Sequence, residues 1–186
     1  MEGRTLQNNV SEAALDDATL SFANDVFDLA RIGDAEMLLQ LLRKGLPSNL
    51  RNHKGDSLLM LASYHGHWDA VSVLLEYHAD PDLRNKSGQT PLSGAAFKGD
   101  LAMIKLLLAY GANIDGMSAG GRTALMVAAM FNRAEIVKHL IAHGADIDAR
   151  DDIGADALEA ARRLDAWDTY AQIEQARNAR AFTANT

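Results

Sequence analysis

The sequence predicts an all-α solenoid, in which helix–turn–helix units stack side by side and are joined by turn or finger loops. The first observation is a period of 33 residues in the glycines, seen at Gly55, Gly88, Gly121 and Gly154. The second is that small core-type residues recur at the same interval, at Ala62, Ala95, Ala128 and Ala161. A unit of this length cannot bury its apolar face alone and must stack on its neighbours. The period therefore predicts an elongated stack.

Each unit is expected to contain two short helices after a turn. In the central unit, Thr90 suits the N-cap of the first helix and Pro91 suits its first position. A break at Gly99 follows, and a second helix with apolar residues at helical spacing ends at Gly111 in a left-handed cap. His78 takes the position of Gly111 one unit earlier, where a left-handed histidine is tolerated but uncommon.

The same register predicts the domain organisation. We expect a flexible N-terminal segment at 1–20, a repeat domain at 21–178 and a flexible tail at 179–186. The last unit becomes polar because nothing covers the outer face of a terminal repeat. Within the domain we expect an N-cap repeat at about 22–51, full repeats at 52–84, 85–117 and 118–150, and a C-cap repeat at 151–177.

Composition limits the possible partners and compartments. The chain is 48% hydrophobic and 23% charged with a net charge of −7, which favours a folded, soluble protein. An acidic balance argues against nucleic acid and against an anionic membrane surface as partners. The absence of cysteine excludes disulfides and thiolate chemistry and fits a reducing compartment. We therefore expect a cytoplasmic monomer with no membrane-spanning segment.

The sequence offers little catalytic chemistry, so we expect neither an enzyme nor a cofactor. Catalysis needs a nucleophile beside a base, or a metal, in a site that excludes water. His139 and His143 lie four residues apart and could reach one zinc ion, but their positions in the repeat are those of packing residues. A histidine- or metal-dependent enzyme is the alternative they keep open. Arg84 and Asp115 belong to two recurring sets and could form a surface ion pair between neighbouring repeats.

These motifs resemble those of ankyrin-repeat proteins. The family signature Thr-Pro-Leu-His-x-Ala is matched by Thr90–Ala95 and, less closely, by Thr123–Ala128. The Gly-His pair is present as Gly66-His67, and the closing motif appears at Leu107–Asp115. The resemblance covers about Phe22 to Ala176. The length of the chain, the missing signal sequence and the lack of a second domain resemble the small stand-alone ankyrin-repeat proteins of bacteria. The signature histidine is replaced in each full repeat, by Met60, Ser93 and Met126.

The resemblance implies a non-catalytic scaffold that binds another protein on its concave face, in an adaptor, inhibitor or immunity role. Self-association through the same face is a further alternative. In this family, partners usually meet the turn tips and the inner face of the first helix of each unit. His67 is expected to cap its helix, whereas His65 falls in a position that faces the binding surface.

The candidate binding residues are those that depart from the repeat pattern at these positions. The turn tips supply a first set: His53, Lys54, Asp56, Arg84, Lys86, Gln89, Met117 and Arg122. The inner helix face supplies a second set: Tyr64, His65, Phe97, Lys98, Met130 and Phe131. Tyr64, Phe97 and Met130 share one repeat position and are expected to form a row. Their apolar character, flanked by basic residues, suits an interface with an acidic segment of a protein partner.

Overall fold

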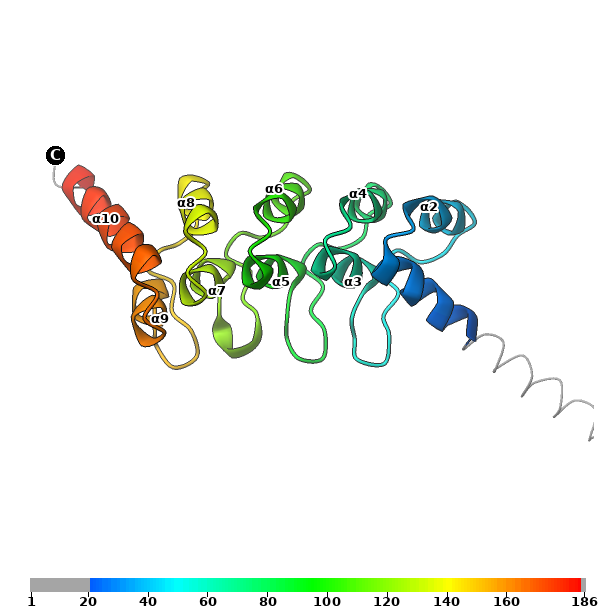
Figure 1. Cartoon of the computed structure of the whole chain (residues 1–186), viewed down its shortest axis with the longest axis horizontal. Coiled ribbons are helices and arrows are strands. Elements are labelled where there is room, and N and C mark those ends of the chain that lie inside the picture. The colour runs from blue at the N-terminus through cyan, green and yellow to red at the C-terminus, as the bar shows by residue number, and fades with distance from the viewer. Residues whose placement is uncertain (1–20, 185–186) are drawn as a thin grey trace, which may run out of the picture.

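The chain folds into a row of helix pairs linked by long loops, as Figure 1 shows. The structure is a computed structural model that describes residues 21–184. The predicted flexible segment 1–20 lies outside the described residues, as do residues 185–186. The helical segments are 21–32, α2 (Ala35–Arg43), α3 (Leu58–Tyr64), α4 (Trp68–Glu76), α5 (Pro91–Lys98), α6 (Leu101–Ala109), the short 3-10 helix η1 (Ala119–Gly121), α7 (Ala124–Met130), α8 (Ala134–Ala142), α9 (Ala157–Arg163) and α10 (Trp167–Ala184).

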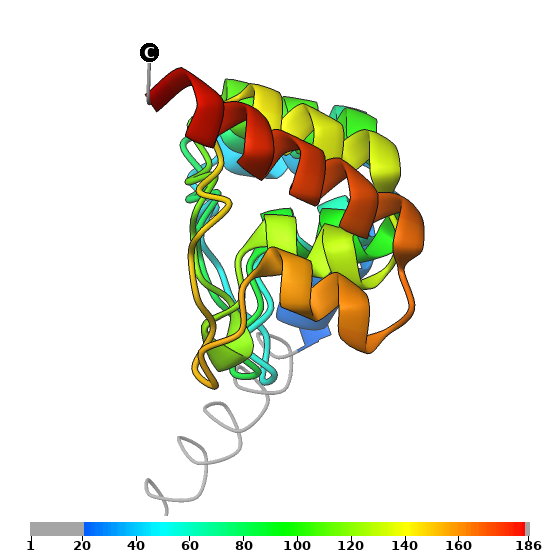
Figure 2. The same ribbon diagram turned by 90° about the vertical axis from the view of Figure 1, so that its left-hand side faces the viewer.

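The helices form two layers. Helices α3, α5, α7 and α9 make an inner layer, and α2, α4, α6, α8 and α10 lie above them as an outer layer (Figure 1). Four long loops, which we call the fingers, lie on one side of the inner layer (Figure 2): 44–57, 77–90, 110–123 and 143–156. The described residues contain one isolated β-bridge, between Arg51 and Ser57, and no named strand. The predicted all-α solenoid is confirmed.

A polar residue recurring at the repeat interval starts each inner helix. The side chains of Ser57, Thr90, Thr123 and Asp156 accept hydrogen bonds from the backbone N–H three residues on, over 2.9–3.3 Å. All four are buried, so each cap satisfies a donor that water cannot reach. In the central repeat, Ser93 takes the signature histidine position. Its hydroxyl accepts from the Thr90 backbone N–H at 3.1 Å and donates to the Thr90 carbonyl oxygen at 2.9 Å.

The core lies between the two layers and runs the length of the stack. Leu74, Leu107 and Leu140 occupy one repeat position of the outer helices and are fully buried. Ala62, Ala95 and Ala128 occupy one position of the inner helices, and their small side chains let neighbouring helices approach closely. Each fully buried leucine contributes about 1.5–3 kcal/mol. This burial occurs between repeats, so no repeat is stable without its neighbours.

The bases of the fingers are joined by a recurring side-chain acceptor. Asn49, Asp82 and Asp115 share one repeat position and each accepts a hydrogen bond, over 2.8–3.1 Å, from a backbone N–H of the next finger. The suggested ion pair of Arg84 with Asp115 does not form among the described residues. The Asp115 carboxylate is instead turned toward the backbone of Asp146. These three side chains therefore fix the spacing of the fingers.

The C-terminal end is closed by α10, which is twice as long as the other outer helices. It continues to Ala184, past residue 179 where the sequence predicts a flexible tail. Arg177 on this helix reaches back to Asp156 at 3.0 Å and to Asp148 at 3.2 Å. These contacts tie α10 to the last finger and to the cap of α9.

Asp156 gives a pH-dependent contribution to stability. Burial alone raises the pKa of its carboxyl, but the Glu159 backbone N–H and the Arg177 guanidinium outweigh burial, and the pKa falls below its usual value. The ionised form therefore stabilises the fold at neutral pH, and this stabilisation is lost as pH falls below about 4. We expect Asp156→Asn to lower the free energy of unfolding by about 1–2 kcal/mol at pH 7.

Urea denaturation at pH 7 and at about pH 3 checks this, because the difference from wild type should shrink at the lower pH. The matched control is Asp148→Asn, which removes a more exposed carboxylate from the same arginine and should have a smaller effect. An equal loss from both substitutions would contradict a special role for the buried carboxylate.

Candidate functional site

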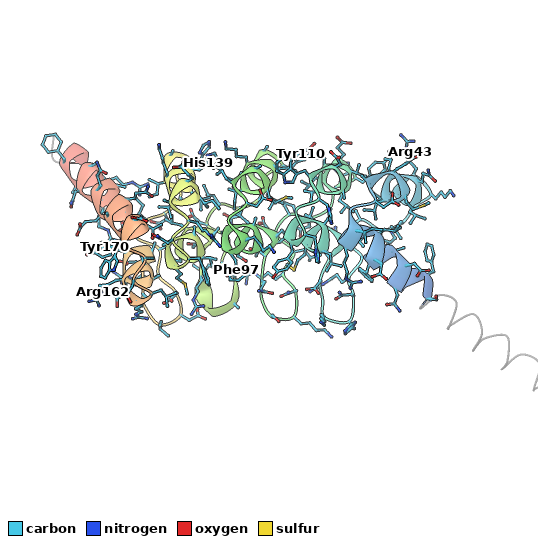
Figure 3. The ribbon with its side chains drawn as sticks, in the orientation of Figure 1. Arg43, Phe97, Tyr110, His139, Arg162 and Tyr170 are labelled. Atoms are coloured by element: carbon cyan, nitrogen blue, oxygen red, sulfur yellow. The ribbon has the colours of Figure 1, made fainter. Side chains whose placement is uncertain are left out.

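A groove of about 380 Å³ lies between the inner helices and two of the fingers. Helices α3, α5 and α7 form its floor, and fingers 77–90 and 110–123 form its opposite wall. Figure 3 shows Phe97 on the finger side of the inner layer. The lining residues are Tyr64, Gln89, Ser93, Gly94, Phe97, Ser118, Ala119, Arg122, Val127 and Phe131. The groove thus brings together five of the predicted residues, namely Tyr64, Gln89, Phe97, Arg122 and Phe131.

Two contacts between neighbouring repeats build the aromatic part of the groove. The Lys98 ammonium nitrogen lies 4.8 Å from the centre of the Tyr64 ring, as in a cation–π interaction. Phe131 meets Phe97 edge to face, with 4.7 Å between ring centroids. Lys98 follows Tyr64, and Phe131 follows Phe97, by one repeat plus one position along the chain. Tyr64, Phe97 and Phe131 still expose about 40% of their surface, so they remain accessible to a ligand.

The predicted row of Tyr64, Phe97 and Met130 takes a different form. Met130 is half-buried, and Phe131 is the exposed residue of that repeat. The reason is that Phe131, as the C-cap residue of α7, reaches over the preceding repeat to Phe97. The exposed aromatic surface is therefore made of diagonal pairs rather than of one repeat position.

Gly94 keeps the floor of the groove open. It lies within α5, where glycine costs a helix about 0.5–1 kcal/mol relative to alanine. Leu61 and Val127 hold the same position in the neighbouring repeats. A β-carbon at Gly94 would make only an ordinary contact of 3.8 Å, with the Tyr64 ring. The glycine is therefore not required by local packing, and its effect is to leave space below the aromatic residues.

Arg122 lines the groove and Lys98 lies over the Tyr64 ring beside it, whereas Lys54 and Lys86 lie on the first two fingers and do not line it. We call these four basic residues the basic rim. Lys54, Lys86 and Lys98 are exposed and form no ion pair within residues 21–184. Arg122 lies 3.9 Å from Asp151, a long contact that leaves much of its charge unsatisfied. The described lining residues include Arg122 and no acidic side chain. The groove is thus suited to an acidic ligand.

The remaining predicted finger residues differ in their availability. His53, Arg84 and Met117 are exposed. Asp56 is half-buried, and its two carboxylate oxygens accept from the side-chain amides of Asn52 at 3.1 Å and Asn85 at 2.9 Å. The structure therefore gives Asp56 a role in holding two adjacent fingers together.

The two histidines beside Gly66 have separate roles. His67 stands at the N-cap position of α4 but makes no side-chain cap bond, contrary to expectation. Its Nε2 lies 2.7 Å from the carbonyl oxygen of Arg31, because the ring packs over Gly33 of the preceding repeat. His65 is exposed and meets the Tyr64 ring edge to face, with centroids 5.7 Å apart. His65 therefore borders the aromatic part of the groove.

The pair His139 and His143 lies on the outer layer, away from the groove. Their ring centroids are 3.9 Å apart, and His143 Nδ1 lies 2.8 Å from the His139 carbonyl oxygen. No group of three or more histidine, cysteine, aspartate or glutamate side chains within residues 21–184 could hold a metal ion.

Sequence reasoning missed Trp68, an exposed tryptophan at the start of α4. Its indole nitrogen lies 3.4 Å from Asp100 of the next repeat. The same position holds Leu101 and Ala134 in the following full repeats and a second tryptophan, Trp167, in the C-terminal repeat. Among the three full repeats, Trp68 is therefore the large aromatic side chain at this position, which is the signal that could have identified it.

The fold is that of a repeat scaffold, with a groove between its inner helices and two of its fingers. The chain belongs to the ankyrin-repeat family, since the family model for three ankyrin repeats matches residues 27–118 and 77–151. Ankyrin repeats generally mediate protein–protein interaction, and the family is typically non-catalytic. No helix within residues 21–184 has the length and apolar character needed to cross a membrane.

Two curated relatives share part of the chain. A Pseudomonas aeruginosa protein whose name describes it as an ankyrin repeat protein is 67% identical over 57 residues, which cover 31% of this chain and 33% of that protein. A rice protein (Oryza sativa subsp. japonica) named as a probable E3 ubiquitin-protein ligase is 40% identical over 48 residues, or 26% of this chain and 10% of its own length. The matches thus span a third of the bacterial relative and a tenth of the rice one.

The ionisation of His65 reports on the groove. The pKa of His65 is held below its ordinary value of 6.5. The largest cause is the loss of solvent around the ring, and the nearby charges of His67, Lys98 and Arg31 lower it further. We expect Lys98→Met to raise the pKa of His65, because a nearby positive charge is removed while the packing volume is kept. An NMR titration of the imidazole protons measures this shift.

The matched control is Lys105→Met on α6. It should leave His65 unchanged and raise the pKa of His139, which Lys105 helps to lower. An unchanged His65 midpoint in the Lys98 variant would show that the ammonium group does not act on the groove.

Proposed function

We propose that this protein is a non-catalytic scaffold that binds a partner protein in the groove between its inner helices and its fingers. The aromatic pairs of the groove carry the proposal. Three aromatic rings lie over adjacent repeats and remain accessible, and aromatic side chains dominate the energetics of protein interfaces. The partner determines whether this binding serves an adaptor, an inhibitor or an immunity role.

The charge of the rim supports a preference for an acidic segment of the partner. Lys54, Lys86 and Arg122 extend from the fingers, and Lys98 lies over Tyr64 beside the groove. Opposite charges across an interface speed association and favour the correct partner over others. We propose that the apolar centre supplies affinity and that the basic rim selects acidic partners. We further propose that the scaffold is a monomer of the cytoplasm, a reducing compartment that the absence of cysteine fits.

The first test removes the aromatic centre. We expect the double variant Tyr64→Ala/Phe97→Ala to lose at least about 2 kcal/mol of binding free energy, or about 30-fold in affinity. The partner is first captured from the native organism with the wild-type protein, and affinities are then measured by calorimetry. Tyr110→Ala is the control, because Tyr110 is equally exposed but lies on the outer layer (Figure 3). Equal affinity of the double variant and wild type would overturn the proposal.

The second test fills the groove instead of removing contacts. Gly94→Leu places at this position the side chain that Leu61 supplies one repeat earlier. We expect binding to fall at least tenfold because the space below Tyr64 is occupied. We also expect the thermal stability to be kept or raised, since a helical glycine is removed. Calorimetry and thermal unfolding followed by circular dichroism separate these two effects.

Gly94→Ala is the matched control for the second test. It gives the same gain in helix propensity but leaves most of the groove open, so its affinity should stay within about threefold of wild type. Tight binding by the leucine variant would show that the partner does not enter the groove.

A further inference from the structure

The binding groove continues past Tyr64 toward the N-terminal end of the stack. A second hollow of about 370 Å³ is lined by Tyr64, His65, Gly66, Lys98 and Asp100 among others. A third, of about 280 Å³, is lined by Gly33, Gly66, His67, Trp68 and Asp69. The groove and the second hollow share Tyr64, and the second and third hollows share Gly66. The three spaces therefore adjoin one another in a row that runs from the fingers to Trp68, and we call this row the recess.

We infer that this recess binds an extended acidic segment of the partner and that Trp68 contacts the end of that segment. The inference rests on the proposed function, because it names the kind of ligand that the groove accepts and adds a residue to the site.

The shape of the recess favours an extended chain. The hollows, of about 380, 370 and 280 Å³, lie close to the lower end of the range of small-ligand pockets, about 300–1,000 Å³, and so receive side chains rather than a folded element. An extended chain projects alternate side chains to one face, which allows successive ones to enter successive hollows. Gly66, between the second and third hollows, is exposed and carries no side chain that would block the path.

The charges favour acidic residues over the groove and the second hollow. Arg122 lines the groove and Lys98 lines the second hollow, where His65 is also exposed. Asp100 is the acidic residue of that hollow, and its two oxygens are used internally. One accepts from the Met103 backbone N–H at 2.9 Å, and the other lies 3.4 Å from the Trp68 indole nitrogen. Lys98 therefore faces the recess without a carboxylate partner among the described residues.

Trp68 gives the end of the recess an apolar character. About half of its surface is exposed, and its contact with Asp100 holds the ring beside the second and third hollows. Asp69 lies next to it and disfavours an acidic residue at that end. The segment therefore has acidic residues where it crosses Lys98 and Arg122, and an apolar residue where it meets Trp68.

The experiment uses a displayed library of random linear 12-residue peptides, selected on the full chain. Enriched peptides should be rich in aspartate and glutamate and carry at least one aromatic or large aliphatic residue. Synthetic copies should bind Trp68→Ala at least tenfold more weakly than wild type. Trp167→Ala is the matched control, because Trp167 starts α10 at the same repeat position and is similarly exposed. Its affinity should stay within twofold.

A second measurement does not depend on the stability of the alanine variant. The chain has two tryptophans, so in Trp167→Phe the fluorescence comes from Trp68 alone. Peptide binding should shift the emission of Trp68 to shorter wavelength as the ring is buried, and an unchanged emission on saturation would overturn its role.

The outcomes separate the inference from the proposed function. Peptides that lose affinity for Tyr64→Ala/Phe97→Ala but bind Trp68→Ala as well as wild type would overturn the extension and support the groove. Peptides indifferent to all of these substitutions would overturn both. Enrichment of basic peptides, or of no linear peptide at all, would overturn the extended acidic ligand and leave the groove to a folded partner.

Discussion

Helices of seven to nine residues are marginal in water, and helices α2 to α9 all fall in this range. Their order comes from burial between neighbouring repeats, of which the fully buried Leu74, Leu107 and Leu140 are the clearest case. The buried caps and the joined finger bases fix the spacing at which this burial occurs. The shape of the groove depends on that spacing, because its walls come from different repeats.

The period of the sequence was sufficient to predict the helices, the turns between them and the caps, since each depends on contacts within a unit. Thr90 and Pro91 start α5 as expected, and His78 adopts the left-handed conformation that its position requires. His67 was misjudged because its hydrogen bond reaches Arg31 in the preceding repeat. Asp56 was grouped with the free finger residues for the same reason, since one of its partners belongs to the next finger.

In the candidate site, too, contacts between repeats could not be predicted from the sequence. Aligning the chain with itself compares equivalent positions, whereas the aromatic contacts join non-equivalent ones, as Lys98 does with Tyr64 and Phe131 with Phe97. Five of the predicted residues line the groove because the finger and helix positions were correctly placed. Which of them touch each other depends on the offset between stacked repeats, and this offset is a property of the three-dimensional stack.

The departures from the repeat pattern have a common physical consequence. Gly94 lowers helix propensity where Leu61 and Val127 would support it, and Trp68 exposes apolar surface where Leu101 is half-buried. Each change disfavours the isolated repeat, yet the core positions of the same repeats keep the pattern. Stability in a solenoid is shared among neighbours. A central repeat can therefore carry a recess for a partner while the repeats on either side hold it in place.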